Sequence, residues 1–394
     1  MKSLEASRAA RLLVLCSRPK PGLGTRPEVR RLLDSGPDWE RLLRKADDEG
    51  VLPLLYWNLR DWRDEVPPDI LGRLKVHYLR NLARNTQLSR EIEPFLRAVT
   101  DSGLKVVLTK GLRLASTIYP DIALRPFWDV DFFVRPADWP AVKKTLDEQG
   151  FEETPEPGTG AGLAAGDPDR AYSPYFRRGG LVLEFHLSVL GLHFPLGPEP
   201  MEAMTTAPIP IFGTEVPVLS PESELCYLCL HAQQHSYQKL IWLADIAELA
   251  SRPGLDWDGV LGVCGSLRIR ASVYHGLRLA EELWPGSLPR EILSKLRPGA
   301  LQRAVLRFFW PEASVASRLT TLPWPYDMPS FFSLWERGSP GLAVRTLAGV
   351  LFPPRHWLAR ASGVPENSPL IYYHYARRLS KPVGLAVRRI VNIP

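Results

Sequence analysis

The first hundred residues of the chain alternate hydrophobic and polar positions with the period of a helix. Apolar residues recur at spacings of three and four after Trp39, after Ile70 and over residues 77–99, and Gly103 then interrupts the pattern. This spacing gathers apolar side chains on one face of a helix, so it predicts amphipathic helices. We therefore expect an N-terminal helical region over residues 1–100.

The period changes after Leu104, where short runs of β-branched and aromatic residues replace the helical spacing. Residues 105–109 and 127–134 are typical of strands, and residues 112–118 and 138–149 again have helical spacing. Strand, helix, strand and helix follow one another within a short stretch, which indicates a core that combines a sheet with helices.

Two further pairs of apolar runs extend this core. Gly179-Gly180 separates residues 171–178 from residues 181–189, and this spacing predicts a β-hairpin. A smaller two-stranded ribbon is expected over residues 209–218. These elements complete an α/β core that we predict over residues 101–220.

Helical spacing returns at Ser220, which has the features of a helix N-terminus. The serine can cap the helix, a proline takes the first helical position, and an acid lies in the first turn. The spacing continues over residues 222–250 and 257–298. We therefore predict a helical domain over residues 221–300 and a basic, aromatic C-terminal helical region over residues 301–394.

Composition narrows the class of protein. With 394 residues, 45% of them hydrophobic, the chain can form two or three domains with real cores, although a mobile loop is expected over the Gly-, Pro- and Ala-rich residues 153–170. Four cysteines are too few for a disulfide framework and favour a reducing compartment. We see no signal-peptide core and no run of about 18 uncharged apolar residues, so we expect a cytoplasmic protein without a transmembrane span. The net charge of +6 favours anionic partners such as nucleotides, nucleic acid or lipid headgroups.

Asp129 and Asp131 are the first candidates for chemistry. They lie two residues apart in an apolar run, and alternate residues of a strand point to the same face. Two carboxylates on one apolar face repel each other and resist burial, so a divalent cation is the usual compensation. Carboxylate oxygens suit Mg²⁺, which often accompanies nucleotide phosphates. The alternative is a pair of exposed acids on an edge strand or in a turn.

A third acid lies on the second strand of the predicted hairpin. Glu184 shares one face of that strand with His186, while Leu183 and Phe185 share the other. If this strand lies beside the strand of Asp131, three carboxylates converge and can hold two divalent ions around a phosphoryl group. In isolation, Glu184 is also compatible with an exposed strand acid.

Basic residues near these acids are candidates for phosphate binding. Gly111 between a strand and a helix lets backbone N–H groups approach phosphate oxygens, and Lys110 adds a positive charge. Arg125 could clamp phosphate as well. The alternatives are an ordinary turn with a solvated lysine, and an arginine that pairs with Asp121 or Asp129.

These residues carry a family resemblance. Residues 108–115 with Thr-Lys-Gly, residues 119–134 with Arg-Pro-Phe-Trp-Asp-Val-Asp, residues 183–186 and residues 231–247 resemble the uncharacterised nucleotidyltransferase-like family of the DNA polymerase beta superfamily. The resemblance covers roughly residues 10–300.

The resemblance implies an α+β fold: a small mixed-sheet nucleotidyltransferase core flanked by N-terminal and C-terminal helical regions. It implies Asp129, Asp131 and Glu184 as catalytic metal ligands. Two features depart from the wider superfamily, which often has Gly-Ser where this chain has Lys110-Gly111 and commonly has Asp at the position of Glu184.

Two histidines follow in the helical domain. His231 and His235 lie one helical turn apart and share a face, and the resemblance implies that their helix packs against the active site. We expect them to contact nucleotide or acceptor; the alternative is a role in helix packing. Asp245 is expected to bond to one of them or to complete a buried network.

Two other features have structural interpretations. Cys226 and Cys229 have the spacing of a zinc or redox motif, but they lie in an apolar helix, where cysteine is a small core residue. The C-terminal region, with a helix predicted over residues 342–351, combines arginines with tyrosines. It could bind nucleic acid or an anionic membrane, or form a solvated helical cap.

We therefore predict a Mg²⁺-dependent nucleotidyltransferase that moves a nucleoside monophosphate from a nucleoside triphosphate such as ATP to an acceptor hydroxyl. Two Mg²⁺ ions are expected, with Glu184 also helping to deprotonate the acceptor. The sequence leaves the acceptor open among small molecules, peptides and RNA. Two alternatives remain: a non-catalytic binding or scaffold protein on the same fold, and a toxin-like enzyme that modifies tRNA or protein.

Overall fold

The structure is a computed structural model, and it describes most of the chain. The described residues are 2–20, 24–154, 174–187, 204, 208–309, 355–377, 379 and 380, with single positions at 336, 341, 348 and 352. Most of the predicted loop over 153–170, nearly all of the helix predicted over 342–351, and much of the basic C-terminal region lie outside the described residues.

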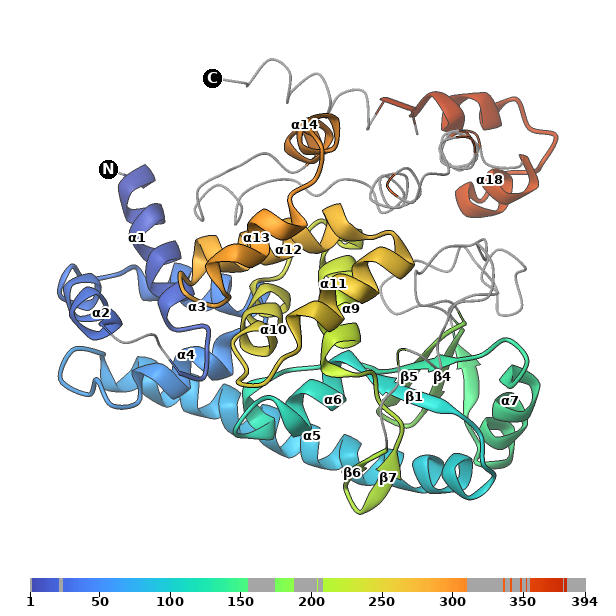
Figure 1. Ribbon diagram of the computed structural model, residues 1–394, viewed down its shortest axis with the longest axis horizontal. Coiled ribbons are helices and arrows are strands. Elements are labelled where there is room, and N and C mark those ends of the chain that lie inside the picture. Colours follow the sequence, from blue (N-terminus) through green and yellow to red (C-terminus); the bar gives the residue numbers. More distant parts are fainter. Residues whose placement is uncertain are drawn as a thin grey trace.

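The N-terminal region is helical, as its periodicity predicts. The helices are α1 (Lys2–Leu15), α2 (Thr25–Asp34), α3 (Trp39–Asp48), α4 (Leu52–Leu59) and α5 (Pro68–Asp101). The long helix α5 ends where the sequence predicts, because Gly103 adopts a left-handed conformation with φ of 67°. It contacts α4 and also β5, β7 and α7, so it connects the N-terminal helices to the sheet (Figure 1).

A mixed five-stranded sheet forms the centre of the α/β region. Its strands are β1 (Val106–Thr109), β2 (Val130–Val134), β3 (Glu152–Thr154), β4 (Tyr175–Arg178) and β5 (Leu181–His186), in the order β1-β2-β5-β4-β3. β2 and β5 are parallel, whereas the other neighbouring pairs are antiparallel. The predicted hairpin at Gly179-Gly180 is confirmed, and so is the α+β class with helical flanks.

Shorter elements connect and extend the sheet. They are α6 (Lys110–Thr117), the 3₁₀ helix η1 (Ile122–Leu124), α7 (Trp139–Glu148) and the ribbon of β6 (Ile209–Ile211) and β7 (Thr214–Val216). The helix predicted over residues 112–118 starts two residues early, so Lys110 and Gly111 belong to its first turn rather than to a separate turn.

The strand predicted from residue 127 begins only at Val130. The guanidinium of Arg84 on α5 donates to the carbonyls of Phe127 and Trp128, the latter at 3.2 Å. These carbonyls are therefore engaged by a side chain instead of by a neighbouring strand. As a consequence Asp129 precedes β2, and the expectation that both aspartates lie within the strand is wrong for Asp129.

Helices follow the sheet. They are α9 (Pro221–Gln234), α10 (Leu240–Ala250), α11 (Trp257–Leu267), α12 (Arg270–Leu283), α13 (Arg290–Leu296), α14 (Ala300–Phe309) and α18 (Arg355–Ser362). Ser220 caps α9 as predicted, since its hydroxyl accepts a hydrogen bond from the Ser223 N–H at 3.1 Å. The helical stretch predicted over residues 222–250 is interrupted, because Ser236 and Tyr237 both adopt φ of 53°.

Two large hydrophobic cores hold most of the described elements together, and a small third one joins Leu358 and Ala359 of α18 to Ile371. One combines N-terminal residues such as Leu12 and Leu54 with Ile246 and Leu277 from the later helices. The other packs the sheet against the second half of α5, around Phe95. The first core thus draws on three of the four predicted regions, because Val107, Leu114 and Phe133 of the predicted α/β core also belong to it. The division at residues 100, 220 and 300 stays a prediction.

Within the described part of the chain, no helix is both long enough and apolar enough to cross a membrane.

Candidate metal and nucleotide site

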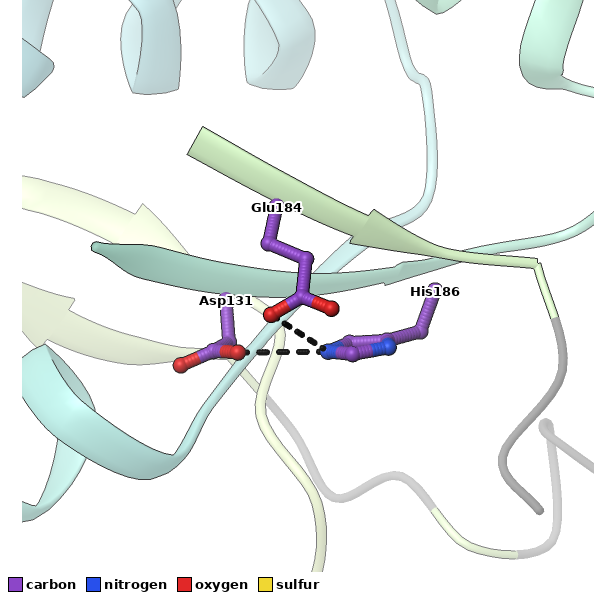
Figure 2. Close-up of side chains that lie close together, drawn as sticks. All are labelled: Asp131, Glu184 and His186. Atoms are coloured by element: carbon purple, nitrogen blue, oxygen red, sulfur yellow. Dashed lines mark hydrogen bonds and ion pairs between the residues drawn. The ribbon is translucent and has the colours of Figure 1, made fainter. Parts of the chain in front are cut away.

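An acidic and imidazole cluster lies across β2 and β5. Asp131 and Glu184 are paired in the register of the two parallel strands, and His186 follows on the same face of β5. His186 Nε2 lies 3.2 Å from Asp131 Oδ1 and 3.6 Å from Glu184 Oε2. Figure 2 shows the three side chains converging from the two strands. The predicted neighbourhood of the two acidic strands is therefore present.

The alternation of the strands explains this geometry. Phe132 and Phe185 point to the opposite face, where their rings stack at 5.5 Å and pack edge-on against Phe95 of α5 at 5.8 and 5.9 Å. This aromatic packing fixes the register of β2 against β5, and the register in turn brings Asp131 opposite Glu184.

Lys110 enters the cluster from the first turn of α6. Its ammonium lies 2.6 Å from Asp131 Oδ1 and 3.2 Å from His186 Nε2, with the Tyr227 ring centroid at 5.6 Å. The side chain is buried. Burial acts to lower the pKa of Lys110, but Asp131 outweighs it and raises that pKa well above its ordinary value. The lysine is thus charged and serves as the counter-ion of the acids.

The backbone of Lys110 is held by a buried acid on α9. Lys110 has φ of 49°, a left-handed conformation that is strained for a residue with a side chain. Glu224 Oε1 accepts hydrogen bonds from the Lys110 N–H at 3.0 Å and from the Thr109 hydroxyl at 2.9 Å. Glu224 is fully buried. The helical region therefore fixes the position from which Lys110 reaches the acids, a role that neither periodicity nor motif indicates.

Gly111 is required by close packing. A Cβ atom at this position would lie 2.7 Å from the Cβ of Phe127, a distance that real Cβ contacts do not show. The glycine therefore lets α6 pack closely against the segment before β2. This packing role comes in addition to the phosphate binding that the sequence predicts for Gly111.

Arg125, which lies in the segment before β2, forms a buried ion pair with Asp245. Its Nη2 donates to Asp245 Oδ2 at 2.8 Å, and the Tyr119 hydroxyl donates to Asp245 Oδ1 at 2.7 Å. Arg125 Nη1 also donates to the Pro126 carbonyl at 3.0 Å. Asp245 therefore completes a buried network, one of the two roles expected for it. A phosphate would have to compete with these partners for the guanidinium.

The charges of the cluster shift its pKa values in opposite directions. Burial acts to raise the pKa of Asp131, but Lys110 and His186 outweigh it and hold that pKa well below its ordinary value. Burial, partly offset by Lys110, raises the pKa of Glu184 to about 8. Burial and the neighbouring carboxylates raise the pKa of Asp129 to about 7. The acids are therefore incompletely compensated by one lysine, and the cluster can accept a further positive charge.

His231 lies on α9 and His235 at its C-terminal cap, and the ring of His231 is 6.2 Å from that of Tyr227, which faces Lys110. Their rings are 4.5 Å apart, and each lies 5.1 Å from the ring of Trp242. Burial lowers the pKa of His235 to about 4, and the charge of Lys110 contributes to this shift. Burial and the same charge also lower the pKa of His231. Both rings are half-buried and neutral, at the side of the acidic cluster.

The structure thus brings together four of the predicted site residues. Lys110 contacts Asp131, and Glu184 lies beside them. Asp129 lies near enough for the charges of Asp131 and Glu184 to raise its pKa. His186 was absent from the predicted site, although its position two residues after Glu184 on the same face of a strand was a sufficient indication.

The donor set fits a divalent cation. One oxygen each from Asp131 and Glu184 and Nε2 of His186 all lie within 4.8 Å of one another, and among the described residues this is the group close enough to hold a metal ion. Hard carboxylate oxygens suit Mg²⁺ or Mn²⁺, and imidazole suits transition metals. Cys226 and Cys229, by contrast, are buried in the first hydrophobic core.

A small mixed sheet with acids paired on parallel neighbouring strands defines a nucleotidyltransferase-type core. A family model described as "Uncharacterised nucleotidyltransferase" matches residues 35–285, and the chain belongs to this family. The comparisons with curated proteins and with solved structures returned no match.

Proposed function

We propose that this protein is a Mg²⁺-dependent nucleotidyltransferase that moves a nucleoside monophosphate from a nucleoside triphosphate to an acceptor hydroxyl. The observation that carries the proposal is the pairing of Asp131 with Glu184 across two parallel strands of a nucleotidyltransferase-family core. The incomplete compensation of these acids by Lys110 supports it, because a divalent ion would supply the missing charge.

Asp131 and Glu184 would hold the metal, with Asp129 as a further ligand just before β2. A bound divalent ion supplies charge neutralisation for the triphosphate and lowers the pKa of the acceptor hydroxyl. The acceptor oxygen forms a bond to the α-phosphorus while the bond to the bridging oxygen breaks, and pyrophosphate leaves with that electron pair. Glu184 receives the acceptor proton.

The basic residues are assigned to the triphosphate. The Lys110 ammonium can turn from Asp131 toward phosphate oxygens on its flexible stem, and Gly111 opens the first turn of α6 to them. His231 and His235 would line the nucleotide or acceptor pocket. Arg125, with its guanidinium engaged by Asp245, would hold the segment before β2 and reach phosphate only through its remaining donors.

We also propose the nucleotide donor, the class of acceptor and the cellular location of the protein. ATP is the first donor to test, and the acceptor is a small molecule, a peptide or an RNA. A cytoplasmic location agrees with the four cysteines, all of them buried free thiols.

The test is transfer of label from α-³²P nucleoside triphosphates in the presence of Mg²⁺ and cell extract. We expect the wild-type protein to label an acceptor and the double variant Asp129→Asn/Asp131→Asn to lose at least about a hundredfold in rate, because it lacks charged metal ligands. The matched control is Glu148→Gln, an exposed acid on α7 that pairs with Lys144. Equal transfer by wild type and the double variant would sink the mechanism.

One observation favours a non-catalytic binding protein as the second candidate. Lys110 already lies against Asp131 at 2.6 Å, so part of the acidic cluster is neutralised without any metal. Calorimetric titration separates the two candidates: nucleotide binding that depends on Mg²⁺ supports the enzyme, and no nucleotide binding at millimolar concentration supports the scaffold. Growth arrest on expression, relieved by the aspartate substitutions, would instead indicate the toxin-like enzyme.

A further inference from the structure

The imidazole of His186 approaches both acids of the pair with the same nitrogen atom. Its Nε2 is 3.2 Å from Asp131 Oδ1 and 3.6 Å from Glu184 Oε2 (Figure 2). Two ligands about 2.1 Å from one ion lie about 3 Å apart when they are adjacent in its coordination sphere. The two distances from Nε2 are therefore close to the spacing that a single shared ion requires, and the three ligand groups lie within 4.8 Å of one another.

The ring is held in this position by its surroundings. His186 is buried, and its ring packs against Phe133 at 5.5 Å and Tyr227 at 6.5 Å. It lies on β5, a strand hydrogen-bonded on both sides. A ligand on a paired strand, with packed rings around it, is positioned before any ion arrives.

A positive charge already lies against two of the three ligand atoms. The Lys110 ammonium is 2.6 Å from Asp131 Oδ1 and 3.2 Å from His186 Nε2. These atoms therefore face a common point that favours a cation. The flexible lysine stem can withdraw from that point when a metal takes its place.

We propose that His186 is a direct ligand of the metal ion together with Asp131 and Glu184, and that this nitrogen makes the site prefer Mn²⁺ over Mg²⁺. Mg²⁺ is a hard ion that favours an all-oxygen shell, whereas imidazole is a good ligand for first-row transition metals. The inference rests on the proposed function only in that the cluster binds a divalent cation, and it specifies which cation and through which side chain.

The experiment is a Mn²⁺ titration of the full chain, with free Mn²⁺ followed by its electron paramagnetic resonance signal and with Mg²⁺ as competitor. We expect wild type to bind Mn²⁺ at least about tenfold more tightly than Mg²⁺. His186→Ala should weaken Mn²⁺ binding about tenfold or more while changing Mg²⁺ binding little. His186→Asp, which provides an all-oxygen set, should retain Mg²⁺ binding and lose the preference. The control is His356→Ala, an exposed histidine on α18.

A spectroscopic measurement keeps the inference testable even if a variant folds poorly. Electron spin echo modulation of the wild-type Mn²⁺ complex should show a directly bound nitrogen, and the His186→Asp complex should lack it. No nitrogen coupling in wild type, or unchanged Mn²⁺ affinity in folded His186→Ala, would overturn the role of His186 while nucleotidyl transfer persists. Conversely, nitrogen-coupled Mn²⁺ binding without any label transfer supports His186 and overturns the proposed function alone.

Discussion

The two faces of the central sheet use neighbouring residues for opposite purposes. On one face, Phe132 and Phe185 stack at 5.5 Å and pack against α5. On the other, Asp131, Glu184 and His186 meet a buried lysine. The aromatic face removes apolar surface from water and provides stability, whereas the polar face buries charges that favour the folded state little. Stability and chemistry are thus divided between alternate positions of the same two strands.

The largest effect that this comparison predicts is from Phe185→Ala. Phe185 is fully buried and contacts Phe95, Phe132, Phe176 and Trp139, so truncation leaves a cavity in the aromatic face. We expect the free energy of unfolding to fall by about 3–5 kcal/mol, measured by urea denaturation followed by circular dichroism.

The paired variant is Glu184→Gln, one residue earlier on the opposite face. Burial raises the pKa of Glu184 to about 8, so this carboxylate does not favour folding in the absence of metal. We expect a change in unfolding free energy within about 1 kcal/mol. A loss comparable to that of Phe185→Ala would show that the polar face also carries the stability of the sheet.

The next largest effect is expected from Glu224 on α9, which holds the backbone of Lys110 at the polar face of the sheet. Glu224→Ala removes the acceptor of the Thr109 hydroxyl and the Lys110 N–H, both buried. Each unsatisfied donor costs about 1–3 kcal/mol, so we expect a loss of about 2–4 kcal/mol in unfolding free energy.

The matched variant for this position is Glu224→Gln. The amide oxygen can still accept both hydrogen bonds. Burial outweighs the Arg113 guanidinium 4.0 Å away and raises the pKa of Glu224, so the charge itself brings little stability. We therefore expect Glu224→Gln to retain most of the stability that Glu224→Ala loses. Equal losses in the two variants would contradict the hydrogen-bonding role and indicate a role for the charge.

A smaller effect is expected from Gly111→Ala, which tests the close approach of α6 to the segment before β2. The added methyl would lie 2.7 Å from the Phe127 Cβ, and overpacking of this kind costs about 1–3 kcal/mol of unfolding free energy. The control is Gly72→Ala on α5, where nothing lies within 4 Å of the new Cβ. There we expect a gain of about 0.5–1 kcal/mol, because alanine favours the helix. A loss of the same size at both positions would rule out the packing explanation.

The local pattern of apolar and polar residues was sufficient to predict those parts of the site that depend on the alternating direction of strand side chains. The two-residue period of a strand predicts that Glu184 and Phe185 point to opposite faces of the sheet, and the turn glycines predict the hairpin. Contacts between distant parts of the chain were not accessible in the same way. Arg84 keeps the segment before Asp129 out of the strand from a position 44 residues away, and Glu224 holds Lys110 across 114 residues. The motif therefore identified the acids, while the side chains that position them required the fold.

The smallest effect concerns His235, beside the polar face, and depends on pH. Burial and the charges of Lys110 and His186 lower the pKa of His235 from 6.5 to about 4, while Asp131 acts in the opposite direction and His231 lies against the ring. A base with a lowered folded pKa takes up a proton on unfolding, so stability falls as pH decreases from about 6.5 to about 4. Allowing for partial exposure of the ring, we expect His235 to contribute about 1–2 kcal/mol to this decrease.

His235→Gln, which cannot take up the proton, should flatten the decrease by that amount, with little change in unfolding free energy at pH 8. Urea denaturation at half-unit steps from pH 8 to pH 4 measures the difference between the variant and wild type. His356→Gln on α18, an exposed position, should leave the wild-type pH dependence intact. Parallel curves for wild type and His235→Gln would mean that burial and the nearby charges do not lower the pKa of His235 in the folded protein.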